Sequence, residues 1–234
     1  MDKKLSRTEN LLGKENILKL KNSCVAIFGI GGVGGYVLEA LVRCGIENID
    51  LFDSDNIDIT NFNRQILATD NTLGKPKAEV GKQRALSINN KANINTFSVF
   101  YTPENADCYD LSKYDYVIDA IDTVSSKIEL IVRCNTLNIP IISCMGTGNK
   151  LNPTMLQVSD IYKTSVCPLA RVMRYELKKK GIKKLKVVYS KEIPIKPENQ
   201  ISQNNRHIPA SIPFVPASAG FIIASEVVKD ICNI

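Results

Sequence analysis

A glycine-rich segment between an apolar run and an amphipathic stretch limits this chain to few folds. Residues 24–28 are apolar and predict a buried strand, and residues 33–44 have the apolar spacing of a helix that stops at Gly45. A strand, a glycine turn and a helix in this order often bind phosphate, because backbone N–H groups at the helix N-terminus can reach its oxygens. The turn contains Gly29, Gly31, Gly32 and Gly34.

Segments with strand and helix patterns alternate along most of the chain. Helices of about ten residues or more between apolar strands indicate a parallel sheet that is covered on both faces. We therefore predict an α/β fold with a mainly parallel, Rossmann-like sheet, helices on both faces and a C-terminal substrate-binding extension. The expected strands are 49–52, 96–100, 116–118, 141–143, 155–158 and 187–189, and the expected helices are 77–88, 125–137, 168–180 and 217–231.

The pattern changes near Gly146, which we interpret as a boundary inside one domain that spans residues 1–234. Residues 1–146 are expected to form a nucleotide-binding half and residues 147–234 a substrate-binding half. In the second half, residues 191–213 combine several prolines with many polar residues, and we expect a mobile loop there.

The composition is that of an ordinary globular protein. Hydrophobic residues make up 44% of the chain and charged residues 23%, which excludes a wholly disordered chain. No apolar run reaches membrane-spanning length and the N-terminus is polar, so we expect a cytoplasmic protein without a membrane partner. The 7 cysteines include no C-x-x-C pair, which predicts free thiols and no structural zinc site.

Polar side chains downstream of the glycine turn distinguish between possible nucleotides. Arg64 can bind phosphate oxygens, Lys77 can neutralise charge near an α-phosphate, and Asp122 can hold Mg²⁺ between phosphates. An NAD(P)-dependent oxidoreductase remains an alternative, although it would use only the glycines and Asp53. The residues that together favour ATP and Mg²⁺ are Asp53, Asp55, Asn61, Arg64, Gln65, Lys77 and Asp122.

The glycine turn and these seven residues resemble the adenylating family that includes the ubiquitin-activating enzymes and their bacterial relatives for thiamine and molybdopterin synthesis. The resemblance spans most of residues 20–150. It implies that a substrate carboxylate attacks the α-phosphate of ATP, which gives an acyl-adenylate and pyrophosphate. It also implies that Asp53 holds the ribose, that Arg64 and Lys77 stabilise the α-phosphate, and that Asp122 binds Mg²⁺.

The same resemblance implies a homodimer in which an N-terminal arginine reaches the ATP site of the other subunit. Arg7 is the candidate for that role. An activator of a ubiquitin-like sulfur-carrier protein, with sulfur-transfer proteins as partners, is a second reading within the family. Such activators usually carry two C-x-x-C pairs, which this sequence lacks.

Segments of the second half resemble the tRNA threonylcarbamoyladenosine dehydratase branch of the family. That branch is similar over essentially the whole chain, and it implies an ATP-dependent cyclisation of N6-threonylcarbamoyladenosine in tRNA with release of AMP. Residues 198–207 form a shorter segment than this branch often has. The matching segments are 146–154, 158–164, 167–170, 187–192 and 212–216.

Basic residues in the second half predict a surface for tRNA, since clustered cations attract a phosphate backbone. The candidates are Arg171, Arg174, Lys178, Lys179, Lys180, Lys183 and Lys184. Ring closure within one substrate needs no enzyme nucleophile, so we assign no catalytic role to Cys144, in an apolar strand, or to Cys167, the better placed of the two. His207 is expected to be a solvent-exposed loop residue rather than a general base.

Overall fold

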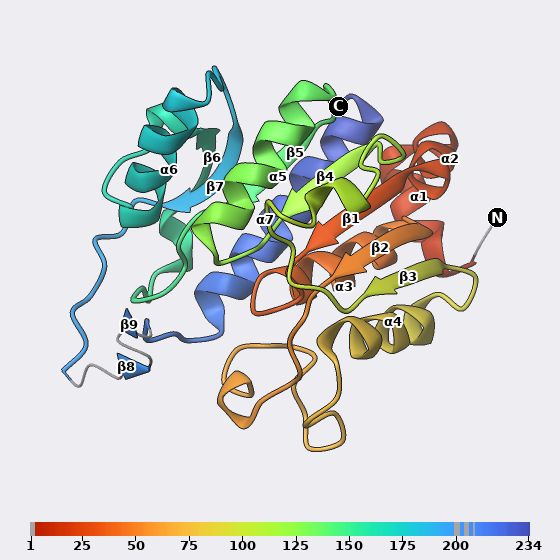
Figure 1. The fold of residues 1–234 in the computed structure, drawn as a ribbon. Helices are drawn as coiled ribbons and strands as arrows, with labels where there is room; N and C mark the ends of the chain where they lie inside the picture. Colours follow the sequence, from red (N-terminus) through yellow and green to blue (C-terminus); the bar gives the residue numbers. More distant parts are fainter. Residues whose placement is uncertain (1–2, 199–201, 204–205, 208) are drawn as a thin grey trace.

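A seven-stranded sheet organises the computed structural model, which describes residues 3–198, 202–203, 206–207 and 209–234 (Figure 1). Its strand order is β3-β2-β1-β4-β5-β7-β6, and each neighbouring pair is parallel except β6 with β7. This arrangement confirms the predicted mainly parallel sheet. The strands are β1 Cys24–Phe28, β2 Asn48–Phe52, β3 Asn93–Phe97, β4 Tyr116–Asp119, β5 Ile141–Cys144, β6 Leu156–Asp160 and β7 Lys186–Ser190.

Helices cover both faces of the sheet, as predicted. On one face α2, α3, α4 and α7 pack together, whereas α5 and α6 cover the other (Figure 1). No helix in the described part of the chain is long and apolar enough to cross a membrane. The helices are α1 Ser6–Leu12, α2 Lys14–Asn22, α3 Gly34–Cys44, α4 Lys77–Ile88, α5 Val124–Thr136, α6 Pro168–Lys179 and α7 Phe214–Cys232.

Helix ends follow local sequence signals. Gly45 ends α3 with a positive φ of 101°, a conformation that costs glycine little. Pro168 begins α6, where the missing N–H of proline leaves no helical hydrogen bond unmade. The observed bounds of these helices therefore agree closely with the bounds expected from the sequence.

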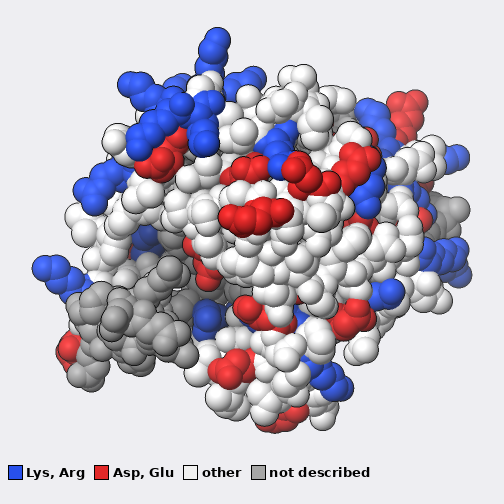
Figure 2. Space-filling model, viewed as in Figure 1, with Lys and Arg blue, Asp and Glu red and all other residues white. Residues whose placement is uncertain are grey.

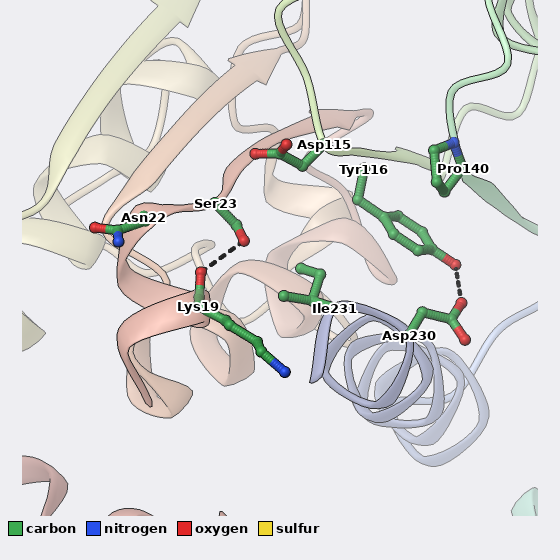
Figure 3. A pocket seen from close by; sticks show the side chains of 8 residues that line it. All are labelled: Lys19, Asn22, Ser23, Asp115, Tyr116, Pro140, Asp230 and Ile231. Atoms are coloured by element: carbon green, nitrogen blue, oxygen red, sulfur yellow. Dashed lines mark hydrogen bonds between the residues drawn. The ribbon is translucent and has the colours of Figure 1, made fainter. Parts of the chain in front are cut away.

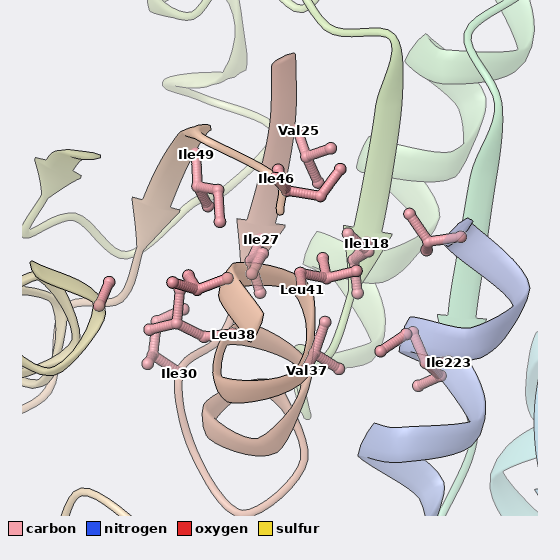
Figure 4. Packing of buried hydrophobic residues seen from close by; sticks show 14 of the residues in the cluster. Val25, Ile27, Ile30, Val37, Leu38, Leu41, Ile46, Ile49, Ile118 and Ile223 are labelled. Carbon is pink, nitrogen blue, oxygen red and sulfur yellow. The ribbon is translucent and has the colours of Figure 1, made fainter. Parts of the chain in front are cut away.

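The larger apolar core joins the two ends of the chain. Val25 and Ile27 of β1 face Leu41 of α3, and Ile223 of α7 lies beside them (Figure 4). The cluster includes buried residues from Leu5 to Cys232. Helix α7 is therefore part of the same core as the first half of the sheet. Burial of apolar surface is the main favourable term in folding, so this core stabilises both ends of the chain together.

Alternate side chains of the same strands form a second core on the opposite face. Phe28 of β1 stacks on Phe52 of β2 with ring centroids 4.1 Å apart, and Phe52 stacks on Phe97 of β3 at 4.4 Å. These offset aromatic stacks bury large areas between neighbouring strands. The strands are thus apolar on both faces, which explains their continuous apolar runs.

Two expected segments differ from the structure or lie partly outside the described residues. The predicted strand 96–100 is wrong in its bounds, because β3 pairs with β2 from Asn93 to Phe97. The apolar residues that follow leave the sheet, and Phe100 is 53% exposed. The predicted loop 191–213 contains a small antiparallel pair, β8 Ser202–Gln203 with β9 Arg206–His207. Residues 199–201, 204–205 and 208 lie outside the described residues, and the mobility of this loop stays a prediction.

We predict that Gly220→Ala destabilises the protein by about 1 to 2 kcal/mol. A methyl group at Gly220 would lie 2.7 Å from the carbonyl oxygen of Val33 and 2.8 Å from Cβ of Tyr36, so α7 would have to move away from α3. Overpacking of this kind costs about 1–3 kcal/mol, and the higher helix propensity of alanine returns up to about 1 kcal/mol. Urea denaturation gives the difference, with exposed Ser225→Ala in the same helix as the control. Equal stability of the two variants would contradict this packing.

Candidate functional site

The glycine turn between β1 and α3 is closed tightly on itself. A methyl group at Gly34 would lie only 1.8 Å from the carbonyl oxygen of Gly29, so the turn admits no side chain there. Gly29 has a positive φ of 88°, and a methyl group on it would lie 2.6 Å from the carbonyl oxygen of Ala120. The loop that follows β4 therefore packs directly against the turn at the carboxyl edge of the sheet.

Asp53, immediately after β2, is tied to the same turn. Its Oδ2 accepts a hydrogen bond from the backbone N–H of Ile30 at 2.6 Å, and its Oδ1 accepts one from the N–H of Asp55 at 2.9 Å. Burial raises the pKa of the Asp53 carboxyl, while the nearby Lys77 opposes that rise. A carboxylate offers about four lone-pair positions, so Asp53 can still accept hydrogen bonds from ribose hydroxyls.

Lys77 lies beside these carboxylates at the start of α4. Its side chain is buried, and its Nζ is 2.7 Å from Oδ2 of Asp55, whose own side chain is 65% exposed. The backbone also connects the two residues, because the N–H of Lys77 donates to the carbonyl oxygen of Asp55 at 2.9 Å. A buried cation held by an exposed acid can change partners when an anion enters, since the acid loses little by returning to water.

Asn61, Arg64 and Gln65 come from a segment that passes over the glycine turn. Asn61 has a local structural contact, since its Oδ1 accepts from the N–H of Asp58 at 3.2 Å. A methyl group at Gly32 would lie 3.5 Å from Cγ of Arg64, so the stem of Arg64 crosses the turn. Its guanidinium donates to the carbonyl oxygen of Thr60 at 2.9 Å.

Gln65 is the most informative member of this segment. Its side chain is buried, and its Nε2 would lie 3.7 Å from a methyl group at Gly31. Its Oε1 is buried without a hydrogen-bond partner. Because buried polar atoms are nearly always paired, this orphaned acceptor beside the glycines favours a site that holds a hydrogen-bonding ligand.

Asp122 lies at the same edge, two residues after the Ala120 carbonyl that packs on Gly29. Its carboxylate is exposed and accepts a hydrogen bond from the hydroxyl of Thr123 at 3.3 Å. In the described part of the chain, no three His, Cys, Asp or Glu side chains gather into a ready-made metal site. One free carboxylate still suits Mg²⁺, which typically takes one or two protein carboxylates and completes its shell with phosphate oxygens and water.

Arg7 is not brought to this site by its own chain. It is exposed on α1, and the preceding Leu5 packs against Gly45, where a methyl group would lie 3.1 Å from Cδ1 of Leu5. Gly45 follows the C-terminal end of α3, whereas the glycine turn precedes the N-terminal end. The predicted role of Arg7 in the site of another subunit stays a prediction.

The predicted nucleic-acid residues gather at α6 and the segment after it, where Figure 2 shows a group of basic side chains. Arg174 is bound internally, because its Nη1 donates to the carbonyl oxygen of Thr164 at 3.1 Å. Lys179 lies 3.9 Å from the ring centroid of Tyr175 and 3.1 Å from a carboxylate oxygen of Glu176. The remaining members are exposed, namely Arg171, Lys178, Lys180, Lys183 and Lys184.

The two cysteines considered as possible nucleophiles are both inaccessible. Cys144 is buried, and burial raises the pKa of its thiol to about 12. Cys167 is also buried, at 2% exposure, so its polar sequence neighbours were a poor guide to its accessibility. His207 lies on β9, and its side chain is outside the described residues.

A hollow of about 420 Å³ opens at the opposite, amino edge of the sheet (Figure 3). Asp230, one of the acidic residues that line it, is paired within the protein. The hydroxyl of Tyr116 donates to Asp230 at 2.6 Å, and Lys186 pairs with the same carboxylate at 2.7 Å.

Two contributors to the site had only faint sequence signals. Pro216 of α7 lies over the glycine turn, since its Cβ would be 3.5 Å from a methyl group at Gly32. Lys127 of α5 is fully buried and bonded to the loop that carries Asp122. A lysine on the otherwise apolar face of a predicted helix was the available signal for Lys127.

Comparison with known proteins agrees with this geometry. A curated tRNA threonylcarbamoyladenosine dehydratase of Bacillus subtilis is 42% identical over 97% of this chain and 93% of its own length. The structure of Escherichia coli tRNA N6-threonylcarbamoyladenosine dehydratase in complex with ATP has a TM-score of 0.90 and 33% identity, and the match covers 98% of this chain and 94% of that one. Its complex with AMP has a TM-score of 0.89 and 34% identity, covering 97% and 93%.

The family itself is recognised over nearly the whole sequence, because the ThiF family matches residues 5–234. The resemblance drawn from the glycine turn and its downstream residues is thereby confirmed. This chain belongs to the ThiF family.

Proposed function

We propose that this protein is an ATP-dependent tRNA threonylcarbamoyladenosine dehydratase of the cytoplasm. It would join AMP to the carboxylate of N6-threonylcarbamoyladenosine in tRNA and then close that group into a ring. One observation carries the proposal. The chain matches a relative of that name along 97% of its length.

The first step would join the substrate carboxylate to the α-phosphate of ATP and break the bond to pyrophosphate. Backbone N–H groups of the glycine turn and the N-terminus of α3 favour the phosphates electrostatically. Asp53 would hold the ribose, Arg64 and Lys77 would stabilise charge on the α-phosphate, and Asp55, Asn61 and Gln65 would complete the nucleotide-binding site. When bound, Mg²⁺ would neutralise phosphate charge, with Asp122 as its protein ligand.

The second step would form the ring. A nitrogen or oxygen of the same threonylcarbamoyl group would attack the activated carbonyl carbon, lose its proton, and release AMP with one former carboxylate oxygen. The net change in the nucleoside is the loss of water. Because both reacting groups belong to one molecule, the protein mainly has to hold them in a reactive pose. The buried Cys144 and Cys167 fit this scheme, which needs no enzyme thiol.

We assign residues 1–146 to ATP binding and residues 147–234 to the RNA substrate, within one domain. Support comes from the position of Pro216 and Asn63. Pro216, in the second half, lies over Gly32, and Nδ2 of Asn63 donates to the carbonyl oxygen of Ser211 at 2.9 Å. The second half thus borders the glycine turn, where a substrate carboxylate would have to enter.

The exposed basic side chains of α6 and residues 180–184 are proposed to bind the tRNA backbone. Tyr175 stands among them with 64% of its surface exposed, and an exposed aromatic ring can stack on an unpaired base. Arg174 is left out of this surface because Thr164 already binds it.

A homodimer is part of the proposal, since a second copy could bring Arg7 to the ATP site. Light scattering that found only monomer at micromolar concentration would speak against that arrangement. An activator of a sulfur-carrier protein has less support, because the match to the Bacillus subtilis relative extends through the second half of the chain.

The proposed function predicts a specific product. Incubation of the protein with ATP, Mg²⁺ and tRNA that carries N6-threonylcarbamoyladenosine should give AMP, pyrophosphate and a nucleoside lighter by one water. Nucleoside mass spectrometry identifies that product, and unmodified tRNA is the control. Isothermal titration with NAD in place of ATP tests the oxidoreductase alternative. Tight binding of NAD without binding of ATP would refute the proposal.

We predict that Asp122→Ala lowers AMP formation by about two to three orders of magnitude, the usual loss for one well-placed electrostatic group. The side chain is exposed and bonds to the adjacent Thr123, so circular dichroism should show an unchanged fold. The control is Glu15→Ala, an exposed acid on α2 at the other side of the molecule. Near-normal turnover in the Asp122 variant would show that the metal assignment is wrong.

The basic surface predicts a salt-dependent contact with tRNA. Replacing Lys178, Lys183 and Lys184 by alanine should weaken tRNA binding and reduce the slope of log K against log salt by about 2 to 3, because each lost phosphate contact removes about 0.7 to 0.9. ATP affinity should be unchanged. Replacement of three exposed lysines elsewhere, Lys3, Lys14 and Lys91, is the matched control. An equal effect in the control would contradict a localised surface.

A further inference from the structure

A fully buried ion pair lies beneath the loop that carries Asp122. Nζ of Lys127 is 3.0 Å from a carboxylate oxygen of Asp119, and the side chains of both residues have 0% exposure. Ser143 of β5 donates to Oδ2 of Asp119 at 2.5 Å and completes the cluster. Buried ion pairs seldom add stability over apolar residues of similar size, because both charges lose their hydration. Stability alone therefore does not explain why this ion pair is buried here.

The pair binds both backbone polar groups of Ile121. The N–H of Ile121 donates to Oδ1 of Asp119 at 3.2 Å, and Nζ of Lys127 donates to the carbonyl oxygen of Ile121 at 2.9 Å. Ile121 directly precedes Asp122. Lys127 therefore fixes the carbonyl of the peptide group that leads into Asp122, and Asp119 fixes the N–H of the peptide group before it.

The same loop is fixed relative to the glycine turn. The N–H of Ala120 donates to the carbonyl oxygen of Phe28 at 2.8 Å, and the carbonyl of Ala120 packs on Gly29. The orientation of the peptide after Ala120 then decides where the Asp122 carboxylate stands with respect to the phosphates. Lys127 and Asp119 control that orientation.

Two other buried carboxylates have different surroundings. Glu39 is bound by Arg43 and Arg84, which joins α3 to α4. Asp50 is bound by Lys113, Tyr114 and Asn95. Neither carboxylate bonds to a loop at the carboxyl edge of the sheet, whereas Lys127 does.

We propose that Lys127 is a positioning residue for Asp122. Its ammonium, together with Asp119, holds the peptide of Ile121 so that the Asp122 carboxylate faces the triphosphate and its metal. This inference rests on the ATP-binding part of the proposed function. It does not depend on which carboxylate is the substrate.

The test compares ATP affinity with and without Mg²⁺ by isothermal titration, in the absence of tRNA. In the natural protein, Mg²⁺ should tighten ATP binding. In Lys127→Met, binding of metal-free ATP should stay within about twofold, while the gain from Mg²⁺ should fall about 10- to 100-fold, as is usual when the support of a metal ligand is removed. Thermal melting without nucleotide reports the stability of each variant separately.

Ser143→Ala is the matched control. It removes a hydrogen bond from the same buried Asp119 but leaves both bonds to Ile121, so it should lower stability and keep the gain from Mg²⁺. If Lys127→Met does not fold, Lys127→Arg serves instead, because a guanidinium keeps the charge but cannot place its donors at the same points.

Three results from the variants would overturn the inference. They are a normal Mg²⁺ gain in a folded Lys127 variant, an equal loss in Ser143→Ala, and failure of both Lys127 variants to fold, which would leave the residue a role in folding alone. Absence of any Mg²⁺ effect in the natural protein would also overturn it. A wrong assignment of the tRNA reaction would give a different result. The dehydrated nucleoside would then be missing, while ATP binding would still depend on Mg²⁺.

Discussion

The contact between the glycine turn and the loop after β4 determines the rest of the site. Gly34 lies so close to the carbonyl of Gly29 that a side chain there would open the turn, and a side chain at Gly29 would push away the loop at Ala120. With side chains absent there, two loops from adjacent parallel strands share one edge. A nucleotide binding along backbone N–H groups at that edge would also meet the side chains of the second loop.

The charged groups at this edge differ in how fully they are paired. Asp119 and Lys127 are completely buried and satisfy each other, so they are suited to hold backbone in place. Lys77 is buried but pairs with an exposed acid, and Asp122 is exposed and accepts from a neighbouring hydroxyl. Chemistry on a triphosphate needs charged groups that are exposed or weakly paired, such as Lys77 and Asp122. A charge that is already neutralised in a buried ion pair interacts little with a ligand.

Much of the fold and of the candidate site followed from local sequence patterns. The glycine turn, the alternation of apolar runs and helical spacing, and Asp53 at the end of a strand are short-range signals, and each predicted an element or a neighbour of the turn. The error in β3 also has a local cause, because the apolar residues up to Phe100 extend beyond the part that pairs with β2. Register in a sheet depends on the partner strand, which a single segment does not reveal.

Contacts between distant segments could not be predicted in this way. Pro216 comes to lie over Gly32 only because α7 returns across the sheet to pack on α3, and the approach of Gly220 to Val33 makes that return possible. The burial of Lys127 likewise depends on Asp119 and Ser143, which come from two neighbouring strands of the sheet. A sequence thus predicts the side chains that can contact a nucleotide more readily than the residues that position those side chains. The positioning residues are recognised by the groups that the fold buries around them.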